Sequence, residues 1–445
     1  MTLADLAGKR VAVLRAGQEG RATAEYLKKH GIASTMIDDD PAVRDESLST
    51  DWITDGSADL TKFDVVFRTQ TVPFLSKPIQ QAISSGVTVT SITKLFFELS
   101  PAPIVGISGT KGKGTTTGLL NAMLAASDRK AYVGGNIGVP PLQFLDELTK
   151  DNVVILELSS FQLQDLEQSP HIAILTNLTQ DHLDHHQSVG EYHAAKQSLV
   201  KYQSDDDIAI INQDDEGSRQ FAKTAGGQVQ WFSTDSETDA YVKDGKVVLK
   251  NGGTVCATED IPVPGPHNLH NVLAASLAAS NLEVSPSAMR EAITSFRGLP
   301  YHLELVGEVD GVRFVNDSYA ANPTATIPAL ESFSSPLIWI AGGYDRQLDF
   351  TELATAVASS SVKAVLLLGD AGKRIKEALT SAYQKADKQL PTLRTVGHKT
   401  DIVAEAFRLA TPGDTVLFSP AAASFDWFDN FNQRGAYFTK AVSDL

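Results

Sequence analysis

The segment 108–116 has the residue types of a phosphate-binding loop. Its glycines allow backbone N–H groups to approach phosphate oxygens, Lys113 supplies a positive charge, and Thr115 supplies a hydroxyl for Mg²⁺. The apolar run 104–107 before it predicts a buried strand, and a helical stretch follows. The spacing is not the standard one, because position 107 is Ile and a glycine separates Lys113 from Thr115. A purely structural Gly/Lys turn is the alternative. The context favours an ATP-binding loop made of Gly109, Thr110, Lys111, Gly112, Lys113, Gly114 and Thr115.

Two further predicted strands end in polar residues. The strand 153–157 ends at Glu157, and the strand 172–175 is followed by Thr176-Asn177 and an Asp/His cluster at 181–186. In a parallel sheet these ends meet the loop at one edge, where ligands gather. Carboxylates and an imidazole beside a triphosphate suit a second divalent cation. Taken singly, Glu157 could be a solvated strand end, and the cluster a polar loop or a zinc site. Together with the loop, a metal–ATP site is the stronger interpretation.

A weaker candidate lies near the N-terminus, where 17–20 joins a predicted strand (10–14) to a helix (21–30). This is the place of a dinucleotide fingerprint, but Arg15 replaces its first glycine. A tight structural turn is at least as good an interpretation, although helix N-terminal amides favour phosphate. The acidic end of the second strand, 38–40, could reach ribose hydroxyls or form a solvated turn. We do not predict NAD binding.

Three single residues are ambiguous. Asn268 and Asn271 lie three apart at the start of an Ala-rich helix, where capping accounts for one asparagine and a ligand could account for both. Lys196, in a predicted helix at 192–199, has by itself the appearance of an ordinary surface lysine.

The elements that position these residues alternate between short β-branched runs, Gly-rich turns and helical stretches. This alternation is typical of βαβ units and parallel sheets. We therefore predict an α/β protein of three domains, at 1–99, 100–299 and 300–445, with a linker at 100–103. Turn residues at 244–245, 251–253 and 310–311 predict hairpins. Further strands are expected at 32–37, 65–67, 87–90, 208–211, 337–341, 365–368 and 415–418.

Composition narrows the functional classes. The 445 residues carry a formal net charge of −16, which argues against a nucleic-acid surface. The single cysteine, Cys256, excludes a disulfide framework and a Cys-based zinc site, and fits a reducing compartment. No apolar run approaches the roughly 20 residues of a membrane span, and the polar start, 1–10, does not resemble a signal peptide. We expect a cytoplasmic protein that binds neither nucleic acid nor membrane.

The motifs occur in an order that resembles the Mur ligase family over essentially the whole chain. They are, from the N-terminus, 109–113 (GTKGK), 134–138 (GGNIG), 157–163 (ELSSFQL), 176–184 (TNLTQDHLD), 193–196 (HAAK), 265–268 with Asn271 (GPHN), 316–318 (NDS), 341–346 (AGGYDR) and 419–426 (SPAAASFD). The resemblance implies a Rossmann-like UDP-substrate-binding domain, a central P-loop ATPase-type domain and a Rossmann-like amino-acid-binding domain. It also implies ATP-dependent attachment of D-glutamate to UDP-N-acetylmuramoyl-L-alanine through an acyl phosphate. We expect the protein to be a monomer.

The same resemblance implies roles for individual residues. Lys113 and Thr115 would hold phosphates and one Mg²⁺, Glu157 and His182 a second Mg²⁺, and Lys196 would be carbamylated and help to organise that metal; Lys113, His182 and Lys196 are the expected catalytic residues. The remaining expectations are contacts with the UDP substrate (Asn136), with ATP (Asn268, Asn271 and Asp317) and with the amino acid (Arg346, Ser424, Phe425 and Phe431).

Several positions depart from the family pattern. A lysine and a threonine expected after 316–318 are Tyr319 and Ala321, so a cation is missing beside the incoming dicarboxylate unless Arg346 compensates. An expected His-Arg pair is Tyr301-His302, at an ATP contact, and both 69–73 and Arg15 alter the nucleotide-sugar end. These departures leave open a ligase for another amino acid, for example L-glutamate, and a nucleotide-binding regulator without ligase activity.

Overall fold

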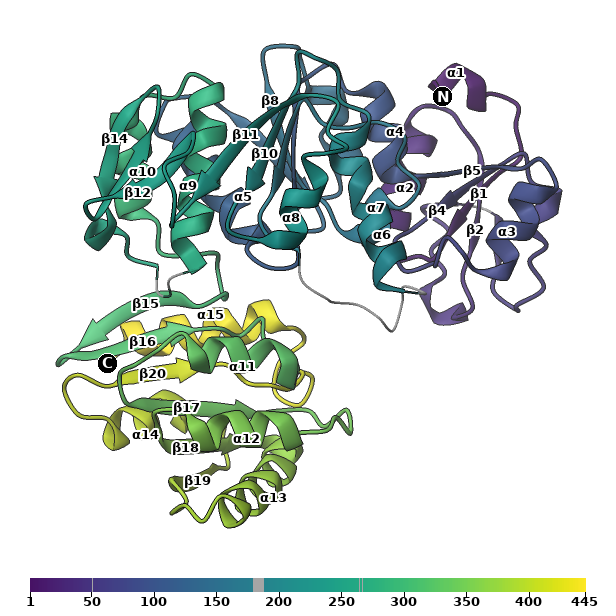
Figure 1. Ribbon diagram of the computed structural model, residues 1–445. Coiled ribbons are helices and arrows are strands. Elements are labelled where there is room, and N and C mark those ends of the chain that lie inside the picture. The colour runs from purple at the N-terminus through teal and green to yellow at the C-terminus, as the bar shows by residue number, and fades with distance from the viewer. Residues whose placement is uncertain (50, 179–187, 264, 266) are drawn as a thin grey trace. The chain divides into compact units, whose positions relative to one another are not determined.

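The computed structural model describes residues 1–49, 51–178, 188–263, 265 and 267–445. By its internal contacts the chain forms two compact units, residues 1–260 with 269–293, and residues 261–268 with 294–445. The first unit contains two sheets and the second contains one. Each unit is α/β with sheets that are mainly parallel, as the alternation of strands and helices predicts (Figure 1).

The first sheet has five parallel strands in the order β3-β2-β1-β4-β5. Its strands are β1 (Val11–Leu14), β2 (Ser34–Ile37), β3 (Asp51–Ile53), β4 (Val65–Arg68) and β5 (Thr88–Ser91), with helices α1 (Leu3–Leu6), α2 (Gln18–Lys29), α3 (Lys77–Ser84) and α4 (Ile92–Leu99) and 3₁₀ turns η1 (Pro41–Val43) and η2 (Leu60–Lys62). β1 and β4 are buried throughout, as expected for central strands covered on both faces. The short, partly exposed β3 was not predicted, because it lacks a continuous apolar run.

The second sheet has nine strands in the order β14-β13-β12-β11-β10-β9-β6-β8-β7, and only its β12–β14 end is antiparallel. The strands are β6 (Ile104–Ser108), β7 (Ala131–Gly135), β8 (Val153–Glu157), β9 (Ile172–Leu175), β10 (Ile208–Asn212), β11 (Gln228–Ser233), β12 (Ala240–Lys243), β13 (Lys246–Leu249) and β14 (Gly253–Ala257). The helices are α5 (Lys113–Ala125), α6 (Ser160–Leu163), α7 (Val189–Lys201), α8 (Glu216–Phe221), α9 (His267–Asn281) and α10 (Pro286–Ser295), with turns η3 (Pro141–Gln143), η4 (Leu145–Glu147) and η5 (Thr258–Asp260). Two of the three predicted hairpins join β12 to β13 and β13 to β14.

In this sheet β6 lies between β8 and β9, and all three strands run parallel. The residues after β6, β8 and β9 therefore meet at one edge. α5 packs against β6, β7 and β8, and its N-cap is the left-handed residue Gly112. The edge strand β7, rich in glycine and only partly buried, was not predicted.

The second unit has a six-stranded sheet in the order β15-β16-β20-β17-β18-β19, in which only β15 is antiparallel. Its strands are β15 (Glu304–Val309), β16 (Val312–Asn316), β17 (Leu337–Gly342), β18 (Val362–Leu368), β19 (Thr392–Val396) and β20 (Thr415–Phe418). Its helices are α11 (Pro323–Glu331), α12 (Thr351–Ser359), α13 (Gly369–Lys385), α14 (Ile402–Leu409) and α15 (Phe431–Ser443), with the turn η6 (Lys399–Asp401). Apolar clusters cover both faces of this sheet. The exposed edge strand β19 escaped prediction.

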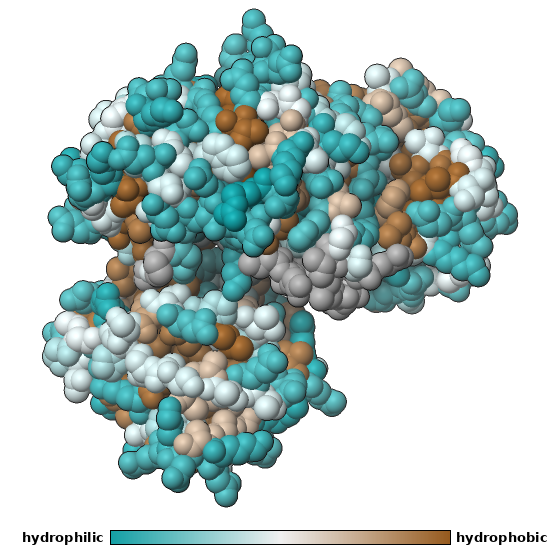
Figure 2. Space-filling view, viewed as in Figure 1, coloured by the Kyte–Doolittle hydropathy of each residue, from teal (hydrophilic) through white to brown (hydrophobic). Residues whose placement is uncertain are grey.

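Hydrophilic side chains cover most of the face shown in Figure 2, with apolar groups scattered among them. Within the described ranges, we find no helix that is both long and apolar enough to cross a bilayer.

Candidate active site

The loop between β6 and α5 has a backbone that requires glycine at two points. Gly109 has φ +150° and Gly112 has φ +82°. A Cβ at Gly109 would lie 2.0 Å from Thr176 Oγ1, and one at Gly112 would lie 2.3 Å from Asn271 Oδ1. The loop therefore approaches the β9 end and helix α9 more closely than any side chain would permit.

The residues after β9 hold this loop in place. Lys111 donates its N–H to Asn177 Oδ1 at 2.9 Å, and its carbonyl accepts from Thr176 Oγ1 at 2.6 Å and from Asn177 Nδ2 at 2.9 Å. Thr110 donates its N–H to the Asn177 carbonyl at 2.9 Å. Strand order explains the arrangement, because β9 pairs directly with β6. The sequence placed Thr176 and Asn177 at this edge without revealing that they position the loop.

Lys113 lies in the first turn of α5 and reaches back over the loop. Its Nζ donates to the carbonyls of Gly109 and Thr110, each at 3.1 Å. Thr115 follows in the same turn and is half-buried. An ammonium group and the N-terminus of a 13-residue helix thus lie together at a glycine-containing loop, an arrangement that attracts phosphate.

Glu157, at the end of β8, is buried and paired with Asn136. Asn136 Nδ2 donates to Glu157 Oε1, and the Asn136 N–H donates to the Glu157 carbonyl, both at 2.8 Å. Gly135 permits this approach, because a Cβ there would lie 2.2 Å from that carbonyl. The solvated-strand-end alternative for Glu157 is therefore wrong, since its side chain is only 3 % exposed.

Lys196 is buried in α7, so its appearance as a surface lysine was misleading. Its Nζ donates to Ser108 Oγ and to the Gly109 carbonyl, each at 3.1 Å. The Tyr192 ring lies one turn earlier, with its centroid 5.1 Å from that Nζ, and Tyr192 OH is 3.1 Å from Thr110 Oγ1. α7 therefore brings a second amino group to the phosphate-binding loop. Lys196 lies 83 residues after Lys113 in the sequence (196 − 113).

Asn268 and Asn271 are both buried, and α9 begins at His267, before either of them. Capping therefore does not account for Asn268. Asn271 Oδ1 accepts from Thr116 Oγ1 at 3.4 Å, which places this residue against the start of α5. His182 and the rest of 179–187 lie outside the described residues. Among those that are described, no group of three or more His, Cys, Asp or Glu side chains is arranged to hold a metal ion.

Asp317, after β16, is a buried carboxyl in the second unit. Its Oδ2 accepts from Ser419 Oγ at 2.6 Å, and its Oδ1 accepts from the Leu303 N–H at 3.1 Å. Burial raises the pKa of Asp317 to about 7, against the opposing effect of these hydrogen bonds and of Arg434. Arg434, itself fully buried, donates to Ser318 Oγ, the Ser318 carbonyl and the Ala422 carbonyl.

The raised pKa of Asp317 has a consequence for stability. Because the folded pKa exceeds the unfolded value of 3.8, the stability linked to this carboxyl is fully present below about pH 4 and is lost as pH rises to about 7, at up to about 1.4 kcal/mol per pH unit. In urea unfolding from pH 4 to 8, the free energy of unfolding of Asp317→Asn should fall less steeply with rising pH than that of the parent. Asp349→Asn, at an exposed carboxyl with a lowered pKa, should keep the parental slope, and an unchanged slope in Asp317→Asn would contradict the assignment.

Two of the four residues expected at the amino acid, Arg346 and Phe425, contact each other. Arg346 lies over the Phe425 ring, 5.3 Å from its centroid, and the Tyr344 ring packs edge-on against Phe425 at 6.2 Å. Phe431, at the start of α15, instead contacts Tyr319 edge-on at 5.3 Å. Ser424 is buried, and its carbonyl accepts from the N–H groups of residues 427 and 428. The sequence did not single out Tyr344.

Tyr319, which stands where a lysine was expected, forms an aromatic stack. Its ring lies 3.8 Å from the His302 ring, with an angle of 27° between the planes. Tyr301 and Leu303, on either side of His302, have φ values of +65° and +49°. His302 and Tyr319, which both depart from the family pattern, thus contact each other. Neither residue's place in the sequence predicts this contact.

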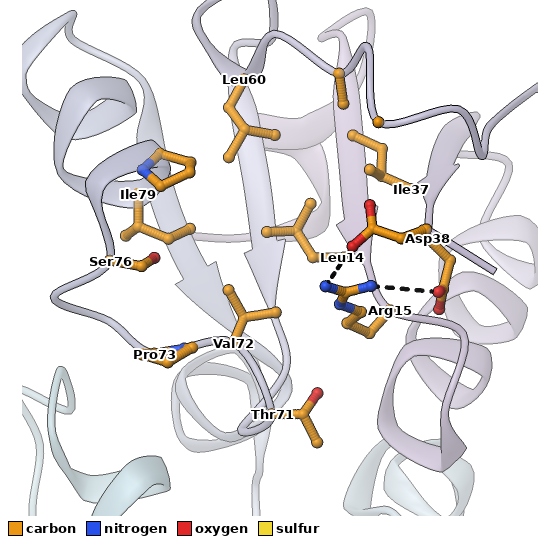
Figure 3. A pocket seen from close by; sticks show the side chains of 14 residues that line it. Leu14, Arg15, Ile37, Asp38, Leu60, Thr71, Val72, Pro73, Ser76 and Ile79 are labelled. Carbon is orange, nitrogen blue, oxygen red and sulfur yellow. Dashed lines mark hydrogen bonds and ion pairs between the residues drawn. The ribbon is translucent and has the colours of Figure 1, made fainter. Parts of the chain in front are cut away.

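A pocket of about 330 Å³ opens at the carboxyl edge of the first sheet. Figure 3 shows apolar side chains from β1, β2, η2 and α3 directed into it, and Arg15 joined by dashed lines to two carboxylates at its rim. The lining residues are Leu14, Arg15, Ile37, Asp38, Asp39, Gly56, Ala58, Leu60, Thr71, Val72, Pro73, Ser76, Pro78 and Ile79. Sequence reasoning found the acidic rim at 38–40 and placed Arg15 and 69–73 at the nucleotide-sugar end, but it did not find the apolar wall residues Leu14, Ile37, Leu60 and Ile79, which come from separate segments.

The turn at 17–20 is built for packing. A Cβ at Gly20 would lie 1.8 Å from the Arg15 carbonyl. The Glu19 carboxylate accepts from Gln162 Nε2 and from the Gln70 N–H, each at 2.9 Å. A carboxylate in the first turn of α2 disfavours a pyrophosphate there, which agrees with the structural interpretation of this turn.

Comparison with known proteins identifies the class. Residues 107–279 match the Mur ligase middle domain, and residues 303–422 match the glutamate ligase domain of Mur ligases. The UDP-N-acetylmuramoylalanine–D-glutamate ligase of Acetivibrio thermocellus is 37% identical, over 98% of this chain and 97% of the relative. The protein of that name from Symbiobacterium thermophilum is 36% identical over 98% of both chains. The protein therefore belongs to the Mur ligase family of ATP-dependent ligases, whose members use ATP and Mg²⁺.

Solved structures share its fold. The UDP-N-acetylmuramate–alanine ligase of Thermotoga maritima superposes with a TM-score of 0.60 at 17% identity, covering 98% of this chain and 99% of that chain. The murein peptide ligase of Psychrobacter arcticus gives 0.51 at 20% identity, covering 97% of this chain and 99% of that chain.

Proposed function

We propose that this protein joins D-glutamate to UDP-N-acetylmuramoyl-L-alanine, with cleavage of ATP to ADP and phosphate, during synthesis of peptidoglycan precursors. The phosphate-binding loop carries the proposal, because it combines Lys113, buried Lys196 and the Glu157–Asn136 pair around the edge of one sheet. The names of relatives at 35–38% identity supply the substrates. These relatives are named as ligases, which argues against the alternative of a nucleotide-binding regulator without ligase activity.

The chemistry follows from the inertness of a carboxylate. One carboxylate oxygen of the L-alanyl group bonds to the γ-phosphorus of ATP, and the bond from that phosphorus to ADP breaks. The neutral amine of D-glutamate then bonds to the acyl carbon of the resulting acyl phosphate. The tetrahedral species expels phosphate and loses the amine proton to give the amide. Lys113 and the amides of residues 109–115 neutralise charge on the transferring group.

The residues present fit a divalent cation in their chemistry. Thr115 offers a hydroxyl beside the phosphate-binding loop, and Glu157 offers a carboxylate whose Oε1 is already oriented by Asn136. Mg²⁺ bound there supplies positive charge to the transferring phosphoryl group. His182 stays a proposed ligand of the second ion. Asn136 is proposed to contact the UDP substrate as well, and Asn268, Asn271 and Asp317 to contact ATP.

Lys196 is proposed to carry a carbamate. Its amine, which donates to Ser108 Oγ and to the Gly109 carbonyl, would, once deprotonated, bond to CO₂ and lose a proton, and the new carboxylate could serve as a metal ligand. Incubation with ¹³C-bicarbonate should give one carbamate carbon signal in the parent protein, and removal of CO₂ should lower activity reversibly. Lys196→Arg should lose both signal and activity, whereas Lys201→Ala, at an exposed position of the same helix, should keep both. A parent without the signal would contradict the assignment.

The two substrate ends are proposed to bind in different units. The apolar pocket of the first sheet suits a pyrimidine base with its ribose at the acidic rim. In the second unit, Arg346, Ser424, Phe425 and Phe431 are proposed to form the amino-acid site. Arg346 supplies the positive charge for the dicarboxylate, because Tyr319 stands where the family pattern has a lysine.

An amino-acid panel tests the function. Phosphate release with Mg²⁺-ATP and UDP-N-acetylmuramoyl-L-alanine should rise with D-glutamate, and mass spectrometry should detect the amide product. Turnover with L-glutamate but not D-glutamate would overturn the choice of substrate. Absence of stimulation by any amino acid would overturn ligation itself.

A further inference from the structure

Arg15 occupies a backbone conformation that favours glycine. Its φ is +69°, in the left-handed region. The backbone is held there from two sides, because the Arg15 N–H donates to the Ile37 carbonyl at 2.8 Å and Gly20 packs against the Arg15 carbonyl. An arginine at this point carries a conformational cost that glycine would avoid, so its side chain is the feature to explain.

That side chain lies at the rim of the pocket between two carboxylates. Arg15 Nη2 is 2.6 Å from Asp39 Oδ2, and Nη1 is 3.4 Å from Asp38 Oδ1. The Asp38 carboxylate is largely occupied by hydrogen bonds within the protein, since it also accepts from the N–H groups of Ala16 at 2.7 Å and Asp40 at 3.1 Å. Asp39 is mostly exposed, and the Arg15 side chain is 42% exposed. The guanidinium thus faces both the carboxylates and the opening.

The two carboxylates at the rim would repel the negatively charged diphosphate of the proposed ligand. A nucleoside diphosphate is an anion, and the only charged side chains that line the described pocket are Arg15, Asp38 and Asp39. Without Arg15 the rim would carry two negative charges and would repel a diphosphate. With it, one guanidinium cancels one of the two negative charges and brings donors to the rim that can turn toward phosphate or a base carbonyl.

We propose that Arg15 is a specificity-determining residue of this pocket, which selects a nucleoside diphosphate over the neutral nucleoside. This inference rests on the proposed function, because that function places the uridine diphosphate group of the substrate in the pocket. A glycine-rich turn at this place would bind phosphate through its backbone amides. Here the Glu19 carboxylate occupies the turn, and the Arg15 guanidinium supplies the donors instead.

Arg15→Gly is the decisive variant, because glycine suits the backbone and the fold should be retained. By calorimetry on the full chain, the parent should bind UDP more tightly than uridine. Arg15→Gly should bind UDP about tenfold to a hundredfold more weakly than the parent, with little change for uridine. In steady state the KM for the nucleotide-sugar should rise, while kcat and the KM for ATP stay near the parental values.

Arg10→Gly provides the matched control. Arg10 pairs with Asp64 at 2.8 Å, is 64% exposed and does not line the pocket, so its loss changes net charge equally without changing UDP binding. Equal UDP affinity in the parent and Arg15→Gly would overturn the inference and leave the proposed function standing. A parent that binds no UDP would contradict both. A parallel loss of uridine and UDP would show that Arg15 only shapes the pocket, and would also overturn selection by charge.

Discussion

Lys113→Ala should lower kcat for phosphate release by about three orders of magnitude. Its ammonium group is held at the phosphate-binding loop by the carbonyls of Gly109 and Thr110, where charge on the transferring phosphoryl group would develop. Loss of one such preorganised donor typically costs about 10²–10³ in rate, and here a full charge is lost as well. Steady-state assays with saturating amino acid and acceptor would measure the change.

Lys111→Ala is the comparison in the same loop. Lys111 holds the loop through its backbone N–H and carbonyl, and its side chain is exposed. Its replacement should therefore cost less than about tenfold, because those hydrogen bonds remain. Thermal unfolding of Lys113→Ala should stay close to that of the parent. A kcat within threefold of the parent would refute the role of Lys113.

Asp165→Ala should lower the free energy of unfolding by about 3–5 kcal/mol, because it leaves a buried charge without its partner. Arg68, at the end of β4, is 1% exposed and Asp165 is 5% exposed. Arg68 Nη2 lies 2.7 Å from Asp165 Oδ1 and also donates to the Phe161 carbonyl at 2.9 Å. The pair joins the first sheet to the segment after α6. Urea unfolding would measure the loss.

Two further variants show whether the loss of stability arises from burial of the charge or from loss of the ion pair itself. Asp64→Ala breaks the exposed pair with Arg10 and should cost less than about 1 kcal/mol. The double variant Arg68→Met/Asp165→Leu should recover most of the loss, since Arg68 Nε and Asp165 Oδ2 have no hydrogen-bond partner within the described ranges and an apolar pair would bury neither atom. A loss below 1 kcal/mol in Asp165→Ala would show that water or another residue compensates Arg68.

Prediction succeeded where the signal is local. Buried central strands such as β8 and β9 are continuous apolar runs, and their bounds agree with those expected. The edge strands β3, β7 and β19 were missed, because a partly exposed strand needs few apolar residues and its pairing depends on a distant neighbour. Helix α2 begins three residues before the predicted start, since Gly17 rather than the glycine at 20 precedes it.

The amino-acid sequence by itself determined the phosphate-binding loop, the alternation of strands and helices and the family, because glycine spacing, a lysine and apolar periodicity are properties of short segments. Only the tertiary structure decided that Lys196 is buried against Ser108, that Glu157 is paired with Asn136 and that Arg15 pairs with two carboxylates at the rim of a pocket. Those contacts join residues that are 21 to 88 positions apart. Their existence depends on which strands are neighbours in a sheet, and pairing between distant segments leaves no mark on the residues of either one.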